Sequence, residues 1–587
     1  MKKRYSHARR HIKGRTRSRS EKRRSSYKHV SAKAGRDYSN KKPQAFARRS
    51  PFKYTALAER DFETLCKRYS YATRFTPAVL NEAKELSDHY LASEETFIAE
   101  REDLRNNLIF TIDGEDARDH DDAISLTVTK NTDNLPVYTL GVHIADVSCF
   151  VTDGSKIDNA ACQRGTSVYV PGQTLPMLPE ILSNGVCSLT ENAVRLTVSG
   201  EFVLDHTGTV KKARFFRSVI KSRHKLTYPI VQAVLDEKLF LGGELDYTLK
   251  KMQTLSEILL AKRLKEGAID LNLLEQKIIL ENDTVREILL KERTASERLI
   301  EEFMLVMNRE VAVVLAKYEL GIFRSHGAPD PLRIAKLNEL LIKLGTPVST
   351  EGSEDPLKMK IKVYNRLYLT LAQIKNNARH QTAAYWTLLA MNQAEYSDLN
   401  KGHYALGFSN YAHFTSPIRR YPDLLAHRLL LSYSKDQSVS VAESLKIYSA
   451  PPITKSDLKY RIERSNINER KAIACEREYI LVKTIRYLSD QTRHDPMPAY
   501  ITKFHPRGHV YACNKTTGIE GIIHKSYFYG KFVLDHNRER LRRIDGKEGG
   551  YGLGSSIFVK LERVDLIRLK IYLALVTDVG ENNSSAA

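Results

Sequence analysis

A crowded run of aspartates constrains this chain more than any other feature. The run Thr111–Ala123 reads TIDGEDARDHDDA and places Asp113, Asp119, Asp121 and Asp122 at relative positions 0, 6, 8 and 9. Like charges this close repel one another, so a fold that gathers them needs a counter-charge. Hard divalent cations supply it, because carboxylate oxygens are the ligands that Mg²⁺ and Mn²⁺ prefer. Two such ions can hold the attacking and leaving oxygens of a phosphodiester. The run therefore indicates metal-assisted phosphodiester chemistry.

The surroundings of the run bear on two other interpretations. An acidic surface loop is the commonest fate of clustered Asp, but this run lies between apolar, strand-like segments at residues 108–112 and 123–126. A calcium loop of the EF-hand type needs Asp at positions 1, 3 and 5, Gly at 6 and Glu at 12, and the run does not have that pattern. A catalytic metal cluster is favoured, and a solvated or structural loop stays the alternative.

Residues 1–50 carry most of the positive charge. They hold 19 Lys and Arg against Glu21 and Asp37, in a chain of 587 residues whose net charge is +22. The segment is rich in Arg, Lys and Ser and has no apolar period. It therefore predicts a disordered basic tail that binds polyanions such as RNA. A transit peptide and a plain solubilising tail are the alternatives.

Cysteine usage and hydropathy indicate the compartment. The six cysteines form no CxxC pair and no Cys/His zinc spacing, which predicts thiols in a reducing environment. No apolar stretch approaches bilayer-spanning length, and no signal peptide begins the chain. We expect a cytoplasmic protein with no membrane partner.

The order of strand-like and helical patterns predicts an α+β domain. Residues 51–101 predict a short helical linker, with a helix that opens at Thr76-Pro77. Residues 102–225 alternate strand-like runs and turns, and the pattern turns helical from about residue 246. A capping box at Thr294–Glu297 precedes one apolar helix, and residues 454–488 predict a further long helix or helix pair. Strands followed by helices over residues 102–490 are typical of an α+β fold.

A second domain is predicted at residues 496–577. Five short strands separated by Gly-, Asn- and charge-rich turns suit an OB-type barrel, which binds single-stranded nucleic acid along one face. Phe504 and Tyr511 are among its candidate base-stacking aromatics, with core packing as the alternative for each. Residues 578–587 are expected to be disordered.

Other segments add candidate RNA contacts. Tyr169 stands at a strand end bounded by Pro and Gly, and Arg419 and Arg420 lie in the turn-like run HFTSPIRRYPDL. An arginine fork matches phosphate oxygens bidentately. Alone, each signal has a structural alternative: Tyr169 in the core, Arg420 in a helix salt bridge, and the helical glutamates Glu301, Glu302 and Glu476 in solvent.

Together, these segments resemble one family. TIDGEDARDHDDA, VHIADVSCFV, GTSVYVPGQTLPMLP, CSL and HFTSPIRRYPDLLAHR resemble, in this order, the RNB catalytic domain of the ribonuclease II / ribonuclease R exoribonucleases. The resemblance spans about residues 102–490, and the barrel is similar to the S1-type RNA-binding domain that follows it. It implies a mixed sheet with helices, then an S1-type OB-fold β-barrel. It also implies processive 3′-to-5′ hydrolysis of single-stranded RNA to nucleoside 5′-monophosphates, with two Mg²⁺ ions for which Mn²⁺ can substitute.

The resemblance carries two sets of residues over to this chain. Its tyrosine that stacks on terminal bases matches Tyr169, and its arginine near the scissile phosphate matches Arg419. The glutamates match positions near the RNA, on helices that offer several registers. The catalytic set, with four metal ligands, is Asp113, Asp119, Asp121, Asp122 and Arg419. With the barrel aromatics, the RNA-binding set is Tyr169, Arg419, Arg420, Glu302, Glu476, Phe504 and Tyr511.

Two features depart from the family pattern. Members usually carry two cold-shock domains before the catalytic one, and about 50 residues between the tail and residue 102 are too few for even one. The second aromatic of the family's base clamp should fall at 267–271, where Leu271 stands. A non-catalytic RNA-binding relative and a DNA nuclease are the alternative functions. A degenerate relative should have lost at least one of the four aspartates, and this chain keeps all four. Ribosomes or other RNA-decay proteins are further partners considered for the tail.

Overall fold

The computed structural model describes residues 61–271, 273–343, 378–433, 453–491, 495–528, 530–535, 540–545 and 550–576. All of these residues belong to one unit of the chain, Ala56–Ala587. The tail predicted over residues 1–50 and the disordered end predicted over residues 578–587 lie outside the described residues. Across the ranges given above, no helix combines the length and hydropathy that a bilayer crossing requires.

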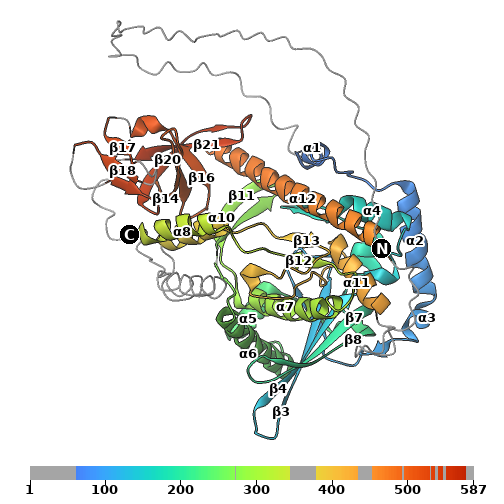
Figure 1. Cartoon of the computed structure of the whole chain (residues 1–587). Helices are drawn as coiled ribbons and strands as arrows, with labels where there is room; N and C mark the ends of the chain where they lie inside the picture. The colour runs from blue at the N-terminus through green and yellow to red at the C-terminus, as the bar shows by residue number, and fades with distance from the viewer. Residues whose placement is uncertain are drawn as a thin grey trace, which may run out of the picture. The chain divides into compact units, whose positions relative to one another are not determined.

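A seven-stranded mixed sheet forms the centre of the region that the sequence predicts as strand-rich (Figure 1). Its strand order is β1-β8-β7-β4-β3-β2-β9. The β1–β8 and β2–β9 pairs are parallel, and the other neighbouring pairs are antiparallel. The strands are β1 (Glu102–Asp103), β2 (Phe110–Asp113), β3 (Asp122–Lys130), β4 (Pro136–Ala145), β7 (Val194–Leu204), β8 (Val210–Lys221) and β9 (His224–Thr227). The strand-rich stretch is confirmed.

Helices cover this sheet and complete the main core. Residues 140–145 at the end of β4 are all buried. Because successive strand side chains point to opposite faces, an unbroken buried run means that both faces are covered there. Three helices pack on one another and bury apolar residues in one cluster with the sheet. They are α5 (Tyr228–Leu235), α6 (Gly243–Lys265) and α7 (Ala295–Leu315).

The helix starts predicted from capping signals are confirmed. One helix begins at Pro77 after Thr76, and α7 begins after Thr294, whose capping box with Glu297 is present in both directions. Residues 455–490 form a single long helix rather than a pair. The remaining helices are α1 (Asp61–Arg68), α2 (Pro77–Ala92), α3 (Glu94–Ile98), α4 (Lys156–Arg164), α8 (Pro331–Lys343), α10 (Ala378–Ala390), α11 (Tyr421–Tyr433) and α12 (Lys455–Asp490).

A β-hairpin interrupts the stretch that the sequence predicts as helical from about residue 246. Its two strands pair antiparallel around Asn282 and Asp283, whose φ angles are +51° and +60°. Two consecutive positive φ angles are the requirement of a type I′ hairpin turn, so this Asn-Asp pair was the missed signal. The two-stranded sheets are β10 (Glu275–Glu281) with β11 (Thr284–Lys291), β5 (Val168–Val170) with β6 (Gln173–Leu175), and β12 (Phe323–Ser325) with β13 (Glu395–Ser397).

The last part of the described chain is a closed five-stranded barrel (Figure 1). Its order is β14-β15-β16-β21-β20, closed by antiparallel pairing of β14 with β20. Its core continues into α12 through Ile485 and into β11 through Val285 and Ile288. The barrel strands are β14 (Met497–Phe504), β15 (Val510–Asn514), β16 (Glu520–Ile523), β20 (Ser556–Asp565) and β21 (Lys570–Val576). Between β16 and β20 in the chain, a separate sheet is formed by β17 (Phe532–Leu534), β18 (Arg540–Arg543) and β19 (Gly550–Gly552).

Candidate active site

The aspartate run connects two antiparallel strands and lines a cavity. Strand β2 ends at Asp113 and β3 begins at Asp122, so the intervening loop is held at both ends by the sheet. All four aspartates of the predicted set line a cavity of about 270 Å³, called the acidic cavity below. Its lining is Asp113, Asp119, Asp121, Asp122, Tyr228, Ile300, Glu301, Met304, Leu305, Asn308, Tyr411, Thr415, Ser416, Arg419 and Arg420. Sequence-distant segments therefore meet at the predicted aspartates.

Asp121 is the most buried of the four carboxylates, with 3% of the residue exposed. Its Oδ1 accepts a hydrogen bond of 2.8 Å from the backbone N–H of Ile418. Its Oδ2 accepts none from the described residues and lies 3.4 Å from Nε of Arg419. A buried carboxylate oxygen without a hydrogen bond is unusual, and its lone pairs are free for another partner.

Two of the carboxylates resist ionisation in the protein as it stands. Burial raises the pKa of Asp121 well above its usual range, against the attraction of Arg419. Burial, together with the charge of Asp113, raises the pKa of Asp122 to about 7, although Arg419 and Arg420 work against it. A cation bound beside Asp121 and Asp122 would act against both shifts.

The donor set fits a hard divalent cation. Four carboxylates share one cavity, and one buried oxygen has no hydrogen bond. Oxygen-only donor sets select Mg²⁺ or Mn²⁺ over softer metals. Within the described ranges, no three His, Cys, Asp or Glu side chains are close enough together to form a finished metal cage. The residues thus match the chemistry of such an ion, and the carboxylates would have to draw closer to bind it.

A turn before α11 presents the two predicted arginines to this cavity. Arg419 keeps 44% of its side chain exposed, and its Nη2 donates to Oγ of Ser416 at 2.9 Å. Arg420 instead pairs with Asp423 at 2.7 Å, which is the helix salt bridge considered as its alternative. Both line the acidic cavity. Both guanidinium groups keep donors for a ligand, because Nε of Arg420 has no hydrogen-bond partner among the described residues. Arg419 is the more exposed of the two.

Tyr169 lies on β5 with 38% of the residue exposed, so the core alternative does not hold for it. Its hydroxyl donates to Oδ2 of Asp119 at 2.5 Å, and its backbone N–H donates to Oε1 of Glu476 on α12 at 3.0 Å. Burial and the charge of Asp119 raise the pKa of the Tyr169 phenol, so the hydroxyl stays a donor. The structure brings Tyr169, Glu476 and the aspartate loop together.

Two predicted RNA-binding residues lie elsewhere. Glu302 is buried, with 4% exposed, and forms an ion pair with Arg263 of α6. Its neighbour Glu301 lines the acidic cavity instead. Phe504 is 7% exposed and packs in the barrel core, which the core alternative anticipated. Tyr511 is half-buried at the barrel surface, where Lys503 lies 5.5 Å from its ring centre.

The cavity residues absent from the predicted set include Glu301, Asn308 and Tyr228. Glu301, Met304, Leu305 and Asn308 follow the i, i+3, i+4, i+7 spacing of one helix face. If one residue of this helix face is known to line the cavity, the spacing predicts that Glu301, and not Glu302, lines it as well. Tyr228 opens α5 directly after β9. Burial and the charges of Asp122 and Asp113 raise the pKa of its phenol. No local sequence pattern indicates that Tyr228 lines the cavity.

Comparisons with known proteins place this geometry in context. Residues 101–436 match the family model described as "RNB domain". The chain is 34% identical to Ribonuclease R 1 of Lactococcus lactis subsp. lactis, over 84% of this chain and 58% of that protein. It is 36% identical to Ribonuclease R of Thermotoga maritima, over 82% of this chain and 66% of that protein. The chain thus spans less than two thirds of the length of both relatives.

Solved structures share the fold. Mycoplasma genitalium RNase R, in complex with ribose-methylated single-stranded RNA, superposes with a TM-score of 0.77 at 26% identity, over 88% of this chain and 78% of that chain. Yeast Ssd1, a pseudonuclease, superposes with a TM-score of 0.62 at 18% identity, over 82% of this chain and 58% of that chain. The second likeness concerns the fold alone.

Proposed function

Because the chain belongs to the RNB-domain family of ribonucleases II and R, we propose that it is a processive 3′-to-5′ exoribonuclease. It hydrolyses single-stranded RNA to nucleoside 5′-monophosphates with two Mg²⁺ ions, for which Mn²⁺ can substitute. The observation that carries the proposal is the acidic cavity itself: all four aspartates, Arg419 and Arg420 line it, and Tyr169 is hydrogen-bonded to one of those aspartates.

Asp113, Asp119, Asp121 and Asp122 would hold the ions. When bound, the ions would supply positive charge for the attacking and departing oxygens of the phosphodiester. The raised pKa values of Asp121 and Asp122 support this assignment, because a bound cation would stabilise the ionised form of each carboxylate against the cost of its burial.

The chain's own side chains would bind and orient the RNA end. Arg419 donates to the non-bridging oxygens of the scissile phosphate, where negative charge develops. Tyr169 presents an exposed ring on which a terminal base stacks. Glu476 fixes the backbone of that tyrosine from α12, so its role is to orient the ring rather than to contact RNA.

The barrel at the end of the described chain serves as an S1-type RNA-binding domain in this proposal. It is a closed five-stranded barrel, the architecture whose exposed face binds single strands. Tyr511 remains half-buried at its surface beside exposed Lys503. That pair combines a stacking ring with a positive charge for the phosphate backbone.

A non-catalytic RNA-binding protein is the second candidate. The pseudonuclease Ssd1 has the same fold, so the fold alone does not distinguish the two. The complete aspartate set and the partly exposed guanidinium of Arg419, which lines the same cavity, favour the enzyme.

Replacing Asp121 by Asn tests the proposal. The amide keeps an acceptor for Ile418 but removes the negative charge, so hydrolysis of a 5′-labelled oligoribonucleotide should fall by at least about 100-fold. RNA binding should stay within about threefold, because Arg419 and Tyr169 are untouched. Asp116→Asn is the matched control, since Asp116 lies in the same loop but is exposed, and it should keep the native rate.

The pattern of products reports direction and chemistry. The labelled RNA should shorten one nucleotide at a time from its 3′ end, release nucleoside 5′-monophosphates, stop with EDTA and resume with Mg²⁺. A DNA oligonucleotide of the same sequence should persist, because only RNA offers the 2′-OH. Native activity of Asp121→Asn would refute the catalytic role of Asp121. A native protein that binds RNA without cleaving it would favour the non-catalytic candidate.

A further inference from the structure

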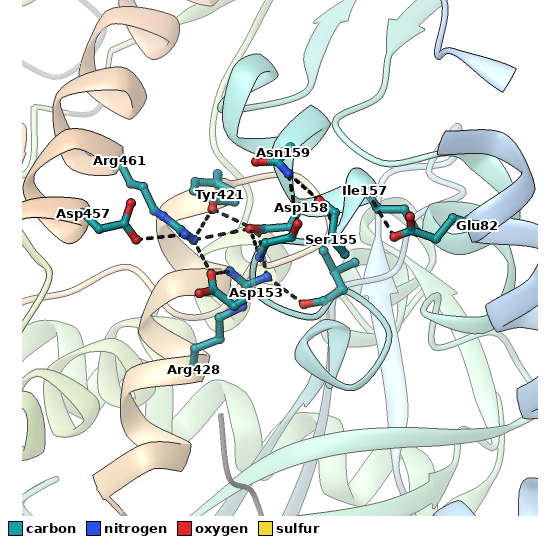
Figure 2. A network of polar contacts seen from close by, with 12 residues as sticks. Glu82, Asp153, Ser155, Ile157, Asp158, Asn159, Tyr421, Arg428, Asp457 and Arg461 are labelled. Atoms are coloured by element: carbon teal, nitrogen blue, oxygen red, sulfur yellow. Dashed lines mark hydrogen bonds and ion pairs between the residues drawn. The ribbon is translucent and has the colours of Figure 1, made fainter. Parts of the chain in front are cut away.

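A largely buried network of charged groups joins three segments of the chain (Figure 2). Asp158 comes from the first turn of α4 and Asp153 from the turn just before it. Tyr421 and Arg428 come from α11, and Arg461 comes from α12. We propose that this network, called the α4–α11–α12 network below, positions Arg419 and Tyr169 for the hydrolysis proposed above. The inference rests on that proposed function. Tyr421 is its central positioning residue.

Tyr421 is fully buried, and its hydroxyl sits between opposite charges. It donates to Oδ1 of Asp158 at 3.0 Å and accepts from Nη1 of Arg461 at 2.9 Å. Burial and the charge of Asp158 raise the pKa of the Tyr421 phenol, which keeps the hydroxyl protonated as a donor. The position of this ring is therefore fixed by packing and by two directional hydrogen bonds.

Arg428 and Arg461 hold the same two aspartates from different helices. Nη2 of Arg428 donates to Asp158 at 2.8 Å, and Nη1 of Arg428 donates to Asp153 at 3.1 Å. Arg461 also pairs with Asp153 and, through Nη2, with Asp457 at 2.9 Å. Because guanidinium donors diverge at fixed angles, such pairs define how α11 and α12 are oriented against the start of α4.

The backbone of Tyr421 connects this network to the arginine turn. Its N–H donates to the carbonyl of Gly165 at 3.0 Å, and the N–H of Ser167 donates to the carbonyl of Arg419 at 2.9 Å. Thr166 and Arg420 form an antiparallel bridge between these bonds. The turn with both arginines and the segment that leads to Tyr169 are thus paired, edge to edge, beside the network.

The paired segments also meet the aspartates directly. Ile418, just before Arg419, donates its N–H to Asp121, and Tyr169, two residues beyond Ser167, donates its hydroxyl to Asp119. A shift of Tyr421 would therefore move the guanidinium of Arg419 relative to the carboxylates. Displacements of about 1 Å can cost on the order of 100-fold in rate.

Helix α12 packs closely against the start of the segment that leads to Tyr169. Nδ2 of Asn468 donates to the carbonyl of Gln163 at 2.9 Å. A Cβ at Gly165 would lie 2.7 Å from Cβ of Asn468, and the φ of Gly165 is +72°. The chain passes so close to α12 that only glycine fits, and the start of the paired segment is thereby held in place.

A purely stabilising role accounts poorly for this network. Buried ion pairs lose as much by desolvation as they gain by attraction, and apolar side chains of similar size often serve stability as well or better. What such groups offer instead is a defined geometry, because hydrogen bonds are directional and apolar contacts are not. A network of this kind is expected where helices must hold a site in register.

Tyr421→Phe removes the hydroxyl and keeps the ring. Its kcat on an oligoribonucleotide should fall about 10-fold or more, while KM changes by less than about twofold, since an arginine that acts on developing charge affects the transition state most. Tyr433→Phe is the matched control. Tyr433 ends the same helix and donates its hydroxyl to the carbonyl of Leu320, far along α11 from the turn, so both constants should stay native.

A double-mutant cycle separates positioning from general destabilisation. If Tyr421 acts through Arg419, then Tyr421→Phe should change kcat by less than about twofold in an Arg419→Ala background. Arg461→Lys, which keeps the charge but loses the fork, should repeat the behaviour of Tyr421→Phe. Failure of both single variants to fold would show that the network serves folding and would overturn the positioning role.

The remaining outcomes are distinguishable. A native protein that releases no mononucleotides would refute the proposed function, and the inference with it. An active native protein, with Tyr421→Phe equally active or with additive effects in the cycle, would refute the positioning role alone.

Discussion

Truncation of Glu302 should mainly lower the stability of the protein, whereas truncation of its neighbour Glu301 on α7 should mainly lower its activity. Glu302→Ala should lower the free energy of unfolding by about 3–5 kcal/mol, the cost of leaving a buried ion without its partner. Only 7% of the Arg263 side chain and 5% of the Glu302 side chain are exposed, so water cannot replace the lost carboxylate. Glu301→Ala should cost less than about 1 kcal/mol, because its pair with Arg293 is 36% exposed on each side.

The rate of RNA hydrolysis should fall more in Glu301→Ala than in Glu302→Ala. Folded Glu302→Ala should degrade RNA within about twofold of the native rate, because Glu302 is outside the acidic cavity. Glu301→Ala should slow hydrolysis, because Glu301 lines that cavity.

Burial raises the pKa of Glu302 even though Arg263 opposes the shift, which indicates that the desolvation of this pair outweighs its attraction. Arg263→Met with Glu302→Leu should therefore recover the stability lost by Glu302→Ala.

Urea unfolding followed by circular dichroism, and the rate of oligoribonucleotide hydrolysis below the transition, measure both effects. A cost below about 1 kcal/mol for Glu302→Ala would refute the burial argument. A larger loss of activity in Glu302→Ala than in Glu301→Ala would refute the helix register.

Three further outcomes follow from the site. The pKa of Asp122 is raised to about 7 in the folded protein, so its contribution to stability is largest at low pH and is lost as the pH rises towards 7. If the site binds Mg²⁺ as proposed, the ion should prefer the ionised form and raise the melting temperature more at about pH 8 than at about pH 5; equal shifts would count against metal binding there. Tyr169→Ala should weaken binding of a short oligoribonucleotide by about 1–3 kcal/mol in a filter-binding assay, whereas Tyr169→Phe, which keeps the ring, should bind within about threefold. Removal of residues 1–50 should make the logarithm of RNA affinity depend less steeply on salt concentration; an unchanged slope would exclude the tail as a phosphate-binding arm.

Most features that depend only on neighbouring residues were predicted correctly from the sequence. The strands on either side of the aspartate run and the capping box at Thr294 were predicted, because alternation and capping depend on neighbouring residues. The hairpin at Asn282-Asp283 was missed although its turn signal is equally local. Phe504 and Tyr511 could not be told apart, because the strand pattern does not say which side of a small barrel is filled.

By itself, the sequence determined which carboxylates can gather at the site: four aspartates lie within a run of ten residues, and that closeness is visible in the chain. Only the tertiary structure decided what joins that set. Arg419 meets Asp121 across almost 300 positions, and Glu301 rather than Glu302 faces the cavity. The physical reason is that one residue along a helix turns a side chain by about 100°, and packing against α6 decides the rotation.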